Sequence, residues 1–292
     1  MNSFSAQAVK PQAGGVRNAM TIDVEDYFQV SAFAPHIARD SWPARECRVE
    51  ANMERILGIL DARQVKATFF TLGWIAERYP QVVKRIVAGG HELASHGYGH
   101  LRASDQDRAQ FMDDISRSKG ILEDLGGQPV LGYRAPSFSI GHGNLWALEA
   151  LREAGYRYSS SIYPVRHDHY GMPDAPRFAF YPNGPDGLLE LPITTVRLMK
   201  RNLPAGGGGY FRLLPYALSR WMMEHVNQTD GQAAIFYFHP WELDPGQPRQ
   251  QGLNWKTRFR HYVNLERMES RIQALTRDFQ WERMDRLFLE PR

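Results

Sequence analysis

The stretch TIDVEDYF, residues 21–28, decides the fold class, because it reads as a short buried strand that ends in a cluster of carboxylates. Asp23, Glu25 and Asp26 place three acidic side chains within four residues. Like charges this close repel one another unless a cation or an arginine lies among them. The run therefore predicts either a helix N-cap or a metal and base site at a strand end.

Other polar residues farther along the chain also stand where an apolar strand pattern ends. They are His96 and His100 in ASHGYGH, Arg134 in GYRAP, and His239 in FYFHPWE. Two histidines and a carboxylate can hold a divalent metal and leave positions open for water and substrate. A second carboxylate, an arginine and a third histidine are the parts needed for a base, its orienting group and an acid. The order of these residues predicts metal-dependent hydrolysis on an α/β scaffold.

Each of these signals also has a simpler explanation. The spacing of His96 and His100 alone is typical of structural or surface histidines, and the intervening glycines favour a turn after the HELAS strand rather than a helix. His239 ends an apolar run, where a histidine is either a satisfied core residue or, because its pKa is near neutral, a general acid. Next to it, Trp241 could wall a substrate pocket, and Glu242 could hydrogen-bond a histidine ring nitrogen.

Strand patterns alternate with helix patterns over most of the chain. The helices are expected at 50–63, 74–88, 105–125, 143–154 and 256–277, and the strands at 20–24, 67–72, 91–97, 130–136, 156–162, 188–196 and 233–241. This alternation predicts a parallel sheet, either open or closed into a barrel. The last helix is expected to pack on the outside of the sheet.

Composition excludes several classes of protein. The 292 residues carry a formal charge of only +3, which is too small to indicate nucleic-acid binding. Cys47 is the only cysteine, so neither an intrachain disulfide nor a cysteine metal cluster can form. Residues 1–18 read as a disordered leader without the apolar core of a secretory signal, and there is no transmembrane segment. We expect a cytoplasmic protein, with peripheral membrane contact left open.

The run Gly206 to Gly209 has two interpretations. It is either a flexible loop or a loop whose backbone comes close to a bound sugar chain, with Tyr210 and Phe211 as a stacking surface. The run does not follow the pattern of a phosphate-binding loop, and the chain has no G-x-S-x-G element typical of a serine nucleophile.

The chain resembles the polysaccharide deacetylases, the NodB-homology group of carbohydrate esterases (carbohydrate esterase family four). It looks most like the branch associated with bacterial exopolysaccharide biosynthesis and the exosortase system. The resemblance lies in TIDVEDYFQVSAF, SHGYGH, YRAPSFS, SSSIYP and FHPWELDP, in the family's order, between about residues 20 and 285. It implies a distorted (β/α) barrel with a C-terminal extension: one domain over 19–285, with the extension at about 200–285.

The resemblance also implies a mechanism and its residues. One divalent metal ion, with zinc as the expected ion, would be held by Asp26, His96 and His100. Asp23 would be the base, Arg134 would orient it, and His239 would be the acid, while Trp241 and Tyr210 would contact the carbohydrate. The reaction would remove N-acetyl groups from N-acetylhexosamine units of an exopolysaccharide or its precursor. This is hydrolysis of a carbon–nitrogen bond other than a peptide bond.

Two departures from the family pattern leave alternatives open. The family usually has adjacent aspartates, whereas this chain has D-V-E-D, so an ungapped match makes Glu25 the base and a bulged match keeps Asp23, which we favour. An aspartate that the family often places after the fifth strand is replaced around Ser159 and Ser160. The competing hypotheses are a hydrolase of another amide, of the cyclic ureide type, and a non-catalytic carbohydrate-binding protein.

Overall fold

The computed structural model describes residues 5–6, 16–166 and 171–289. Within these ranges, one curled sheet of ten strands has the order β1-β7-β8-β6-β5-β4-β3-β2-β11, and β12 pairs with β2. All its pairings are parallel except those that β7 makes with β1 and β8. The strands are β1 (Ser5–Ala6), β2 (Arg17–Val24), β3 (Thr68–Thr71), β4 (Glu92–Ser95), β5 (Gly132–Tyr133), β6 (Tyr158–Ser159), β7 (Phe180–Tyr181), β8 (Leu189–Glu190), β11 (Ile235–Phe238) and β12 (Gln280–Glu282).

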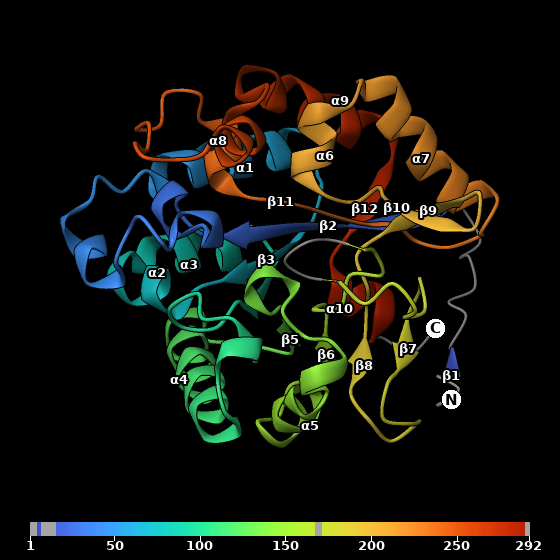
Figure 1. The fold of residues 1–292 in the computed structure, drawn as a ribbon, viewed down its shortest axis with the longest axis horizontal. Coiled ribbons are helices and arrows are strands. Elements are labelled where there is room, and N and C mark those ends of the chain that lie inside the picture. The colour runs from blue at the N-terminus through green and yellow to red at the C-terminus, as the bar shows by residue number, and fades with distance from the viewer. Residues whose placement is uncertain (1–4, 7–15, 167–170, 290–292) are drawn as a thin grey trace.

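Helices connect the parallel strands, and most of them cover the outer face of the curled sheet (Figure 1). They are α1 (Val49–Ala62), α2 (Gly73–Arg78), α3 (Pro80–Ala88), α4 (Arg108–Gly126), α5 (Trp146–Glu153), α6 (Gly208–Leu213), α7 (Tyr216–Gln228), α8 (Trp255–Tyr262), α9 (Met268–Asp278) and α10 (Met284–Phe288). The predicted α/β class and distorted barrel are confirmed.

Two predicted helices are each interrupted. The helix expected at 74–88 breaks at Tyr79, which precedes Pro80 and has a non-helical ψ of 62°, because a proline disfavours helical geometry in the residue before it. The helix expected at 256–277 divides into α8 and α9, and between them Asn264 has a left-handed φ of 51°. The apolar periodicity continues across both breaks, which is why it did not reveal them.

Strand side chains alternate between two apolar layers. Phe69 packs against the helices outside the sheet, whereas Phe70 belongs to the cluster inside the curl. Successive strand residues point to opposite faces, so each short strand contributes to both layers. A third cluster, which includes Phe28, Trp42 and Trp241, packs the loops at the carboxyl ends of the strands.

Helix α10 closes the end of the barrel where the strands begin. The backbone N–H of Met284 donates to Thr68 Oγ1 at 2.8 Å, and that of Asp285 donates to Glu92 Oε2 at 3.1 Å. Thr68 and Glu92 are the first residues of β3 and β4. Because this end is filled, the side chains at the opposite, carboxyl ends of the strands are the ones that can face a substrate.

The expected leader overlaps the sheet, since β2 already begins at Arg17. Residues 1–4 and 7–15 of that leader lie outside the described residues. Among the helices that the structure describes, none combines the length and apolar character needed to cross a membrane. The hairpin of β9 (Thr195–Leu198) and β10 (Arg201–Pro204) forms a separate small sheet beside α7.

Candidate active site

Glu25, His96 and His100 converge at the carboxyl ends of β2 and β4. One ligand atom from each of the three lies within 4.8 Å of the other two, and all three residues are buried. Both histidines follow β4 on a turn, as the glycines between them predicted. Glu25 comes directly after β2. The parallel strands β2 and β4, which flank β3 in the sheet, therefore bring together residues that are about 70 positions apart.

The prediction that Asp26 is the metal carboxylate is wrong. Its Oδ1 accepts the N–H of Tyr27 at 2.7 Å, and its Oδ2 accepts the N–H groups of Arg48 at 2.6 Å and Val49 at 2.9 Å. The Cys47 thiol also donates to Oδ2, at 3.0 Å. Asp26 thus caps a short 3₁₀ helix (Tyr27–Gln29) and the start of α1, the N-cap role that the sequence had left as the alternative.

The donor set suits a divalent cation. Glu25 Oε2 is buried and has no hydrogen-bond partner in the described ranges, although His100 Nε2 lies 2.7 Å away. His96 Nδ1 lies 2.8 Å from the carbonyl oxygen of Arg134, so Nδ1 donates and Nε2 keeps its lone pair. An unsatisfied carboxylate oxygen beside two imidazoles is costly unless a cation completes the group.

Arg134 and Asp23 form a buried ion pair next to this group. Arg134 Nη1 lies 2.5 Å from Asp23 Oδ1 and also donates to Thr21 Oγ1 at 2.9 Å. The guanidinium is fully buried and lies 4.0 Å from the centre of the Phe70 ring. A buried charge needs a paired partner, and the short contact fixes the orientation of the Asp23 carboxylate.

Ser160 stands on the other side of the guanidinium. Arg134 Nη2 donates to Ser160 Oγ at 3.1 Å, and Nε donates to the Ser160 carbonyl oxygen at 3.2 Å. Ser160 Oγ in turn donates to the Leu191 carbonyl oxygen at 2.8 Å. The position that departs from the family pattern is thus filled by neutral oxygens, and Asp23 is the carboxylate that pairs with Arg134.

His239 approaches the same space from the end of β11. Its Nε2 lies 3.9 Å from Asp23 Oδ2 and 3.6 Å from Glu25 Oε1. Its Nδ1 lies 2.8 Å from Glu242 Oε1, the contact that the sequence had raised for Glu242. Arg212, which the sequence analysis missed, donates to the other oxygen of Glu242 at 2.7 Å. Arg212 has no local sequence signal, because its partner lies 30 positions away.

The charges of these groups follow from their surroundings. Burial lowers the pKa of His96 to about 4, so its ring is neutral, which is the form that binds a metal. Burial acts to raise the pKa of Glu25, but the neighbouring histidines, His100 first, lower it to about 2. Burial acts to lower the pKa of His239, yet its hydrogen bond to Glu242 and the charge of Glu25 raise that pKa to about 9.

The two predicted carbohydrate contacts have different settings. Trp241 is only 5% exposed and stacks between His239 and His261, with ring centres 5.2 and 4.1 Å away. It supports the site and does not offer an open face to a sugar, which corrects its expected role as a pocket wall. Tyr210 is 36% exposed and lines a large cavity, so its substrate contact stays a prediction. A second cavity, of about 370 Å³, opens beside His100 and includes Trp42.

Comparison with protein families divides the chain in two. The family described as "Polysaccharide deacetylase" matches residues 40–159. A domain family of unknown function (DUF3473) matches residues 160–289. The boundary falls directly after β6, and both matched parts contribute strands to the same sheet.

Curated relatives match about a third of the chain. A peptidoglycan-N-acetylglucosamine deacetylase from Bacillus cereus is 36% identical over 32% of this chain and 35% of its own length. A peptidoglycan deacetylase-like protein from Gibberella zeae is 34% identical over 37% of this chain and 32% of its own length. The chain therefore spans only about a third of the length of these relatives.

Solved structures share the fold over nearly the whole chain. A Mycobacterium smegmatis protein described as a polysaccharide deacetylase has a TM-score of 0.60 at 19% identity and covers 98% of this chain and 93% of its own. A family-four carbohydrate esterase pseudoenzyme from Bacillus anthracis has a TM-score of 0.50 at 14% identity and covers 95% and 67%. At these identities, the likeness concerns the fold alone.

Proposed function

We propose, from the premise that this chain belongs to the polysaccharide deacetylase family, that it is a metal-dependent hydrolase. It removes N-acetyl groups from N-acetylhexosamine units of an exopolysaccharide or its precursor. The observation that carries the proposal is the convergence of three arrangements on one space. They are the Glu25–His96–His100 group, the Asp23–Arg134 pair and the His239–Glu242 pair.

Glu25, His96 and His100 would hold one divalent ion, for which we propose zinc, since imidazole and carboxylate ligands suit it. When bound, such an ion polarises a carbonyl group and lowers the pKa of a water molecule. The assignment exchanges the expected Asp26 for Glu25, and this leaves Asp23 as the candidate base.

Asp23 takes the proton of the attacking water. Its Oδ1 is occupied by Arg134, whereas Oδ2 faces the space in front of His239. Arg134 fixes the direction of the carboxylate, which a general base requires. Because Ser160 is neutral, it does not compete with Asp23 for the charge of the Arg134 guanidinium.

His239 delivers a proton to the leaving nitrogen. Glu242 accepts from Nδ1, so the Nε2 proton of the imidazolium points toward Asp23 and Glu25. The amide C–N bond breaks as that proton arrives, and acetate and a free sugar amine are the products. The basic pKa of His239, about 9, keeps the acid charged at neutral pH.

The second candidate is a non-catalytic carbohydrate-binding protein. One observation favours it: the neutral Ser160 stands beside Arg134, where the family often has an aspartate. A cyclic ureide hydrolase is disfavoured, because relatives of that kind tend to lose the metal ligands and this chain keeps two histidines and a carboxylate together.

Elemental analysis combined with acetate release from N-acetylglucosamine oligomers tests the proposal. We expect about one metal per chain and acetate release that a chelator abolishes. Asp23→Asn should keep the metal and lose turnover, whereas Glu25→Gln should lose both. Stoichiometric metal with no acetate from any N-acetylated oligomer would favour the binding protein. We also propose a cytoplasmic location, which fractionation of the native cells would check.

A further inference from the structure

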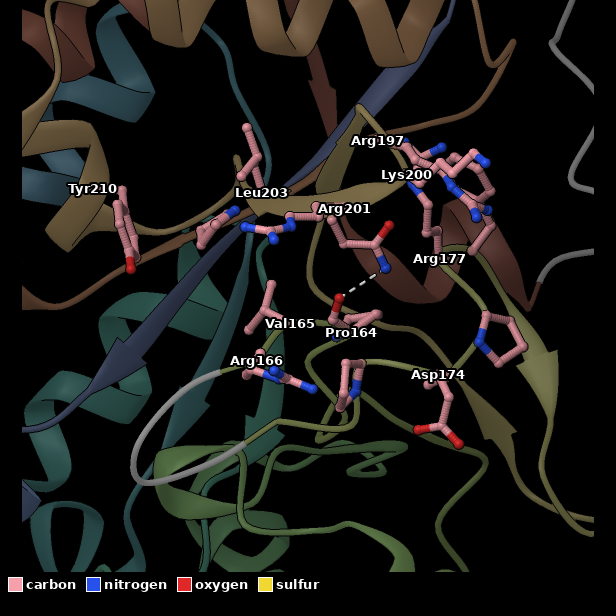
Figure 2. Close-up of a pocket in the computed structure, with 16 residues that line it drawn as sticks. Pro164, Val165, Arg166, Asp174, Arg177, Arg197, Lys200, Arg201, Leu203 and Tyr210 are labelled. Atoms are coloured by element: carbon pink, nitrogen blue, oxygen red, sulfur yellow. Dashed lines mark hydrogen bonds between the residues drawn. The ribbon is translucent and has the colours of Figure 1, made fainter.

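A large cavity of about 1210 Å³ lies between the β9–β10 hairpin and the loops at residues 164–166 and 173–178 (Figure 2). Tyr210 borders it at one end. Its volume is large enough for several sugar rings, since sites for small ligands usually enclose about 300–1,000 Å³. No residue of the Glu25, Asp23 or His239 arrangements lines this cavity.

The walls of the cavity are strongly basic. Among the residues that the structure describes, the charged ones that line it are Arg166, Arg177, Arg197, Lys200, Arg201 and one acid, Asp174. Asp174 lies 2.9 Å from His142 Nε2, and Arg177 is paired with Asp230 at 2.7 Å. Within the described ranges, the three cations of the hairpin make no ion pair. Their charges are left for a ligand, and the concave wall strengthens their combined field.

The hairpin geometry explains how the three cations are presented. Arg201 stands directly opposite Leu198, and Arg197 stands opposite Asn202, whose side chain donates to the Pro164 carbonyl oxygen at 2.9 Å. Met199 and Lys200 form the tip with φ values of 47° and 64°, a tight two-residue turn. The Asn202 bond ties the hairpin to the opposite wall of the cavity. Arg197 and Arg201 leave opposite faces of the hairpin, and both line the cavity.

Tyr210 connects the cavity along the chain to a segment that packs against the candidate active site. Gly208, two residues earlier, is so close to Glu242 that an added Cβ would lie 2.3 Å from Oε1, the oxygen that holds His239. The exposed Tyr210 ring offers the kind of flat face on which a sugar ring can stack. A saccharide positioned at His239 could therefore continue past Tyr210 into the basic cavity.

We propose that this cavity is a subsite for an acidic saccharide, in which Arg197, Lys200 and Arg201 bind carboxylate or phosphate groups next to the N-acetylhexosamine. This inference rests on the proposed deacetylase function and narrows its substrate to an anionic polymer or a phosphate-linked precursor. Arginine pairs with both kinds of group in bidentate fashion, whereas a neutral polymer would leave the three charges without a counterpart.

The test compares two triple variants with the same change in net charge. Arg197→Gln/Lys200→Gln/Arg201→Gln removes the hairpin cations. Arg63→Gln/Lys84→Gln/Arg157→Gln removes three exposed cations that do not line the cavity. Calorimetry measures the affinity of the metal-loaded proteins for a hyaluronan hexasaccharide, for UDP-N-acetylglucosamine and for neutral chitohexaose, at low and high salt. Acetate release is followed in parallel.

We expect the hairpin variant to bind at least one acidic probe about tenfold more weakly, with unchanged chitohexaose affinity and an unchanged control variant. High salt should reduce the difference. Binding of hyaluronan tests recognition of carboxylate groups, and binding of the nucleotide sugar tests recognition of phosphate groups. Equal affinities of wild type and hairpin variant for both acidic probes would overturn the proposal.

The exposed Leu198 and Met199 also allow a lipid surface as the partner, which vesicles containing phosphatidylglycerol test. Loss of vesicle binding in the hairpin variant, with both acidic saccharides still bound normally, would overturn the subsite in favour of a membrane contact. Binding that depends on the three hairpin side chains, with no acetate released from any probe, would support the subsite and count against the proposed deacetylase activity. A failure of the subsite proposal is therefore distinguishable from a failure of the proposed function.

Discussion

Trp241 donates its indole N–H to Glu25 Oε1 at 3.2 Å, and this bond joins the loop after β11 to the carboxylate that faces the two histidines. The same indole stacks on the His239 ring at 5.2 Å, with an angle of 19° between the planes. One buried side chain thus positions both a candidate metal ligand and the candidate acid. The consequence is that metal binding and proton transfer depend on the same short loop.

Separate substitutions of Glu25 and Asp26 should distinguish the metal ligand from the helix N-cap. Glu25→Gln should lose the metal, because the amide cannot supply the charge that Oε2 brings to the two histidines. Asp26→Asn should keep the metal but lower the free energy of unfolding by about 1–3 kcal/mol, since Oδ2 accepts the N–H groups of Arg48 and Val49. Elemental analysis and urea unfolding measure both. Metal loss in Asp26→Asn with metal retained in Glu25→Gln would reverse the assignment.

The Gly208→Ala substitution should disturb the candidate acid His239 indirectly, through Glu242. The new Cβ would lie 2.3 Å from Glu242 Oε1, so the carboxylate must move and His239 loses its orientation. We expect kcat to fall on the order of 100-fold, the scale associated with a catalytic group displaced by about 1 Å. Gly209→Ala is the matched control, because nothing lies within 4 Å of its Cβ position. Equal activities of the two variants would contradict this role for Glu242.

The acid His239 should set the alkaline limit of activity. Its pKa of about 9 means that the imidazolium persists through neutral pH, so kcat/KM should fall only as the pH rises through that value. In Glu242→Gln the carboxylate hydrogen bond that contributes most to raising this pKa is lost, and the alkaline limb should move toward lower pH. A pH profile of kcat/KM, with folding checked by circular dichroism at each pH, measures the shift. An unmoved limb would exclude His239 as the acid.

Glu92 should make the protein less stable as the pH rises. Burial and the neighbouring Asp285 raise its pKa from 4.5 to about 8, so the folded state binds a proton more tightly than the unfolded state does. Between those two values the unfolded carboxyl ionises and the folded one does not, and stability therefore decreases with increasing pH. Glu92→Gln should flatten this dependence in urea unfolding measured across the window. The same slope in wild type and variant would refute the assignment.

Part of the site follows from strand periodicity that the sequence already contains. Alternate residues of a strand point to the same face, so Thr21 and Asp23 share a face, and one further step places Glu25 there as well. Thr21 and Asp23 both contact Arg134, as this period requires. Asp26 is out of phase by one residue. Strand alternation therefore favours Glu25 as the metal carboxylate, whereas the adjacent aspartates of the family pattern favour Asp26.

Other parts had no local signal. Trp241 and Glu25 are separated by 216 positions, and Arg212 reaches Glu242 from a helix that begins within the glycine run. Two of these glycines are required, because Glu242 lies against Gly208 and the side chain of Tyr237 lies against Gly207. The sequence left open a flexible loop or an approach to sugar; the structure shows close backbone packing against β11 and its following loop.

The sequence by itself determined the alternation of strands and helices, the α/β class, and the polar residues at strand ends, because apolar periodicity and strand-end chemistry are local properties of the chain. Only the tertiary structure decided which carboxylate faces the histidines, what supports His239, and where the cations of the hairpin gather. The physical reason is that side-chain direction at a strand end depends on the hydrogen bonds available there. Asp26 turns toward the N–H groups that begin α1, while Glu25 turns toward His100 and Trp241.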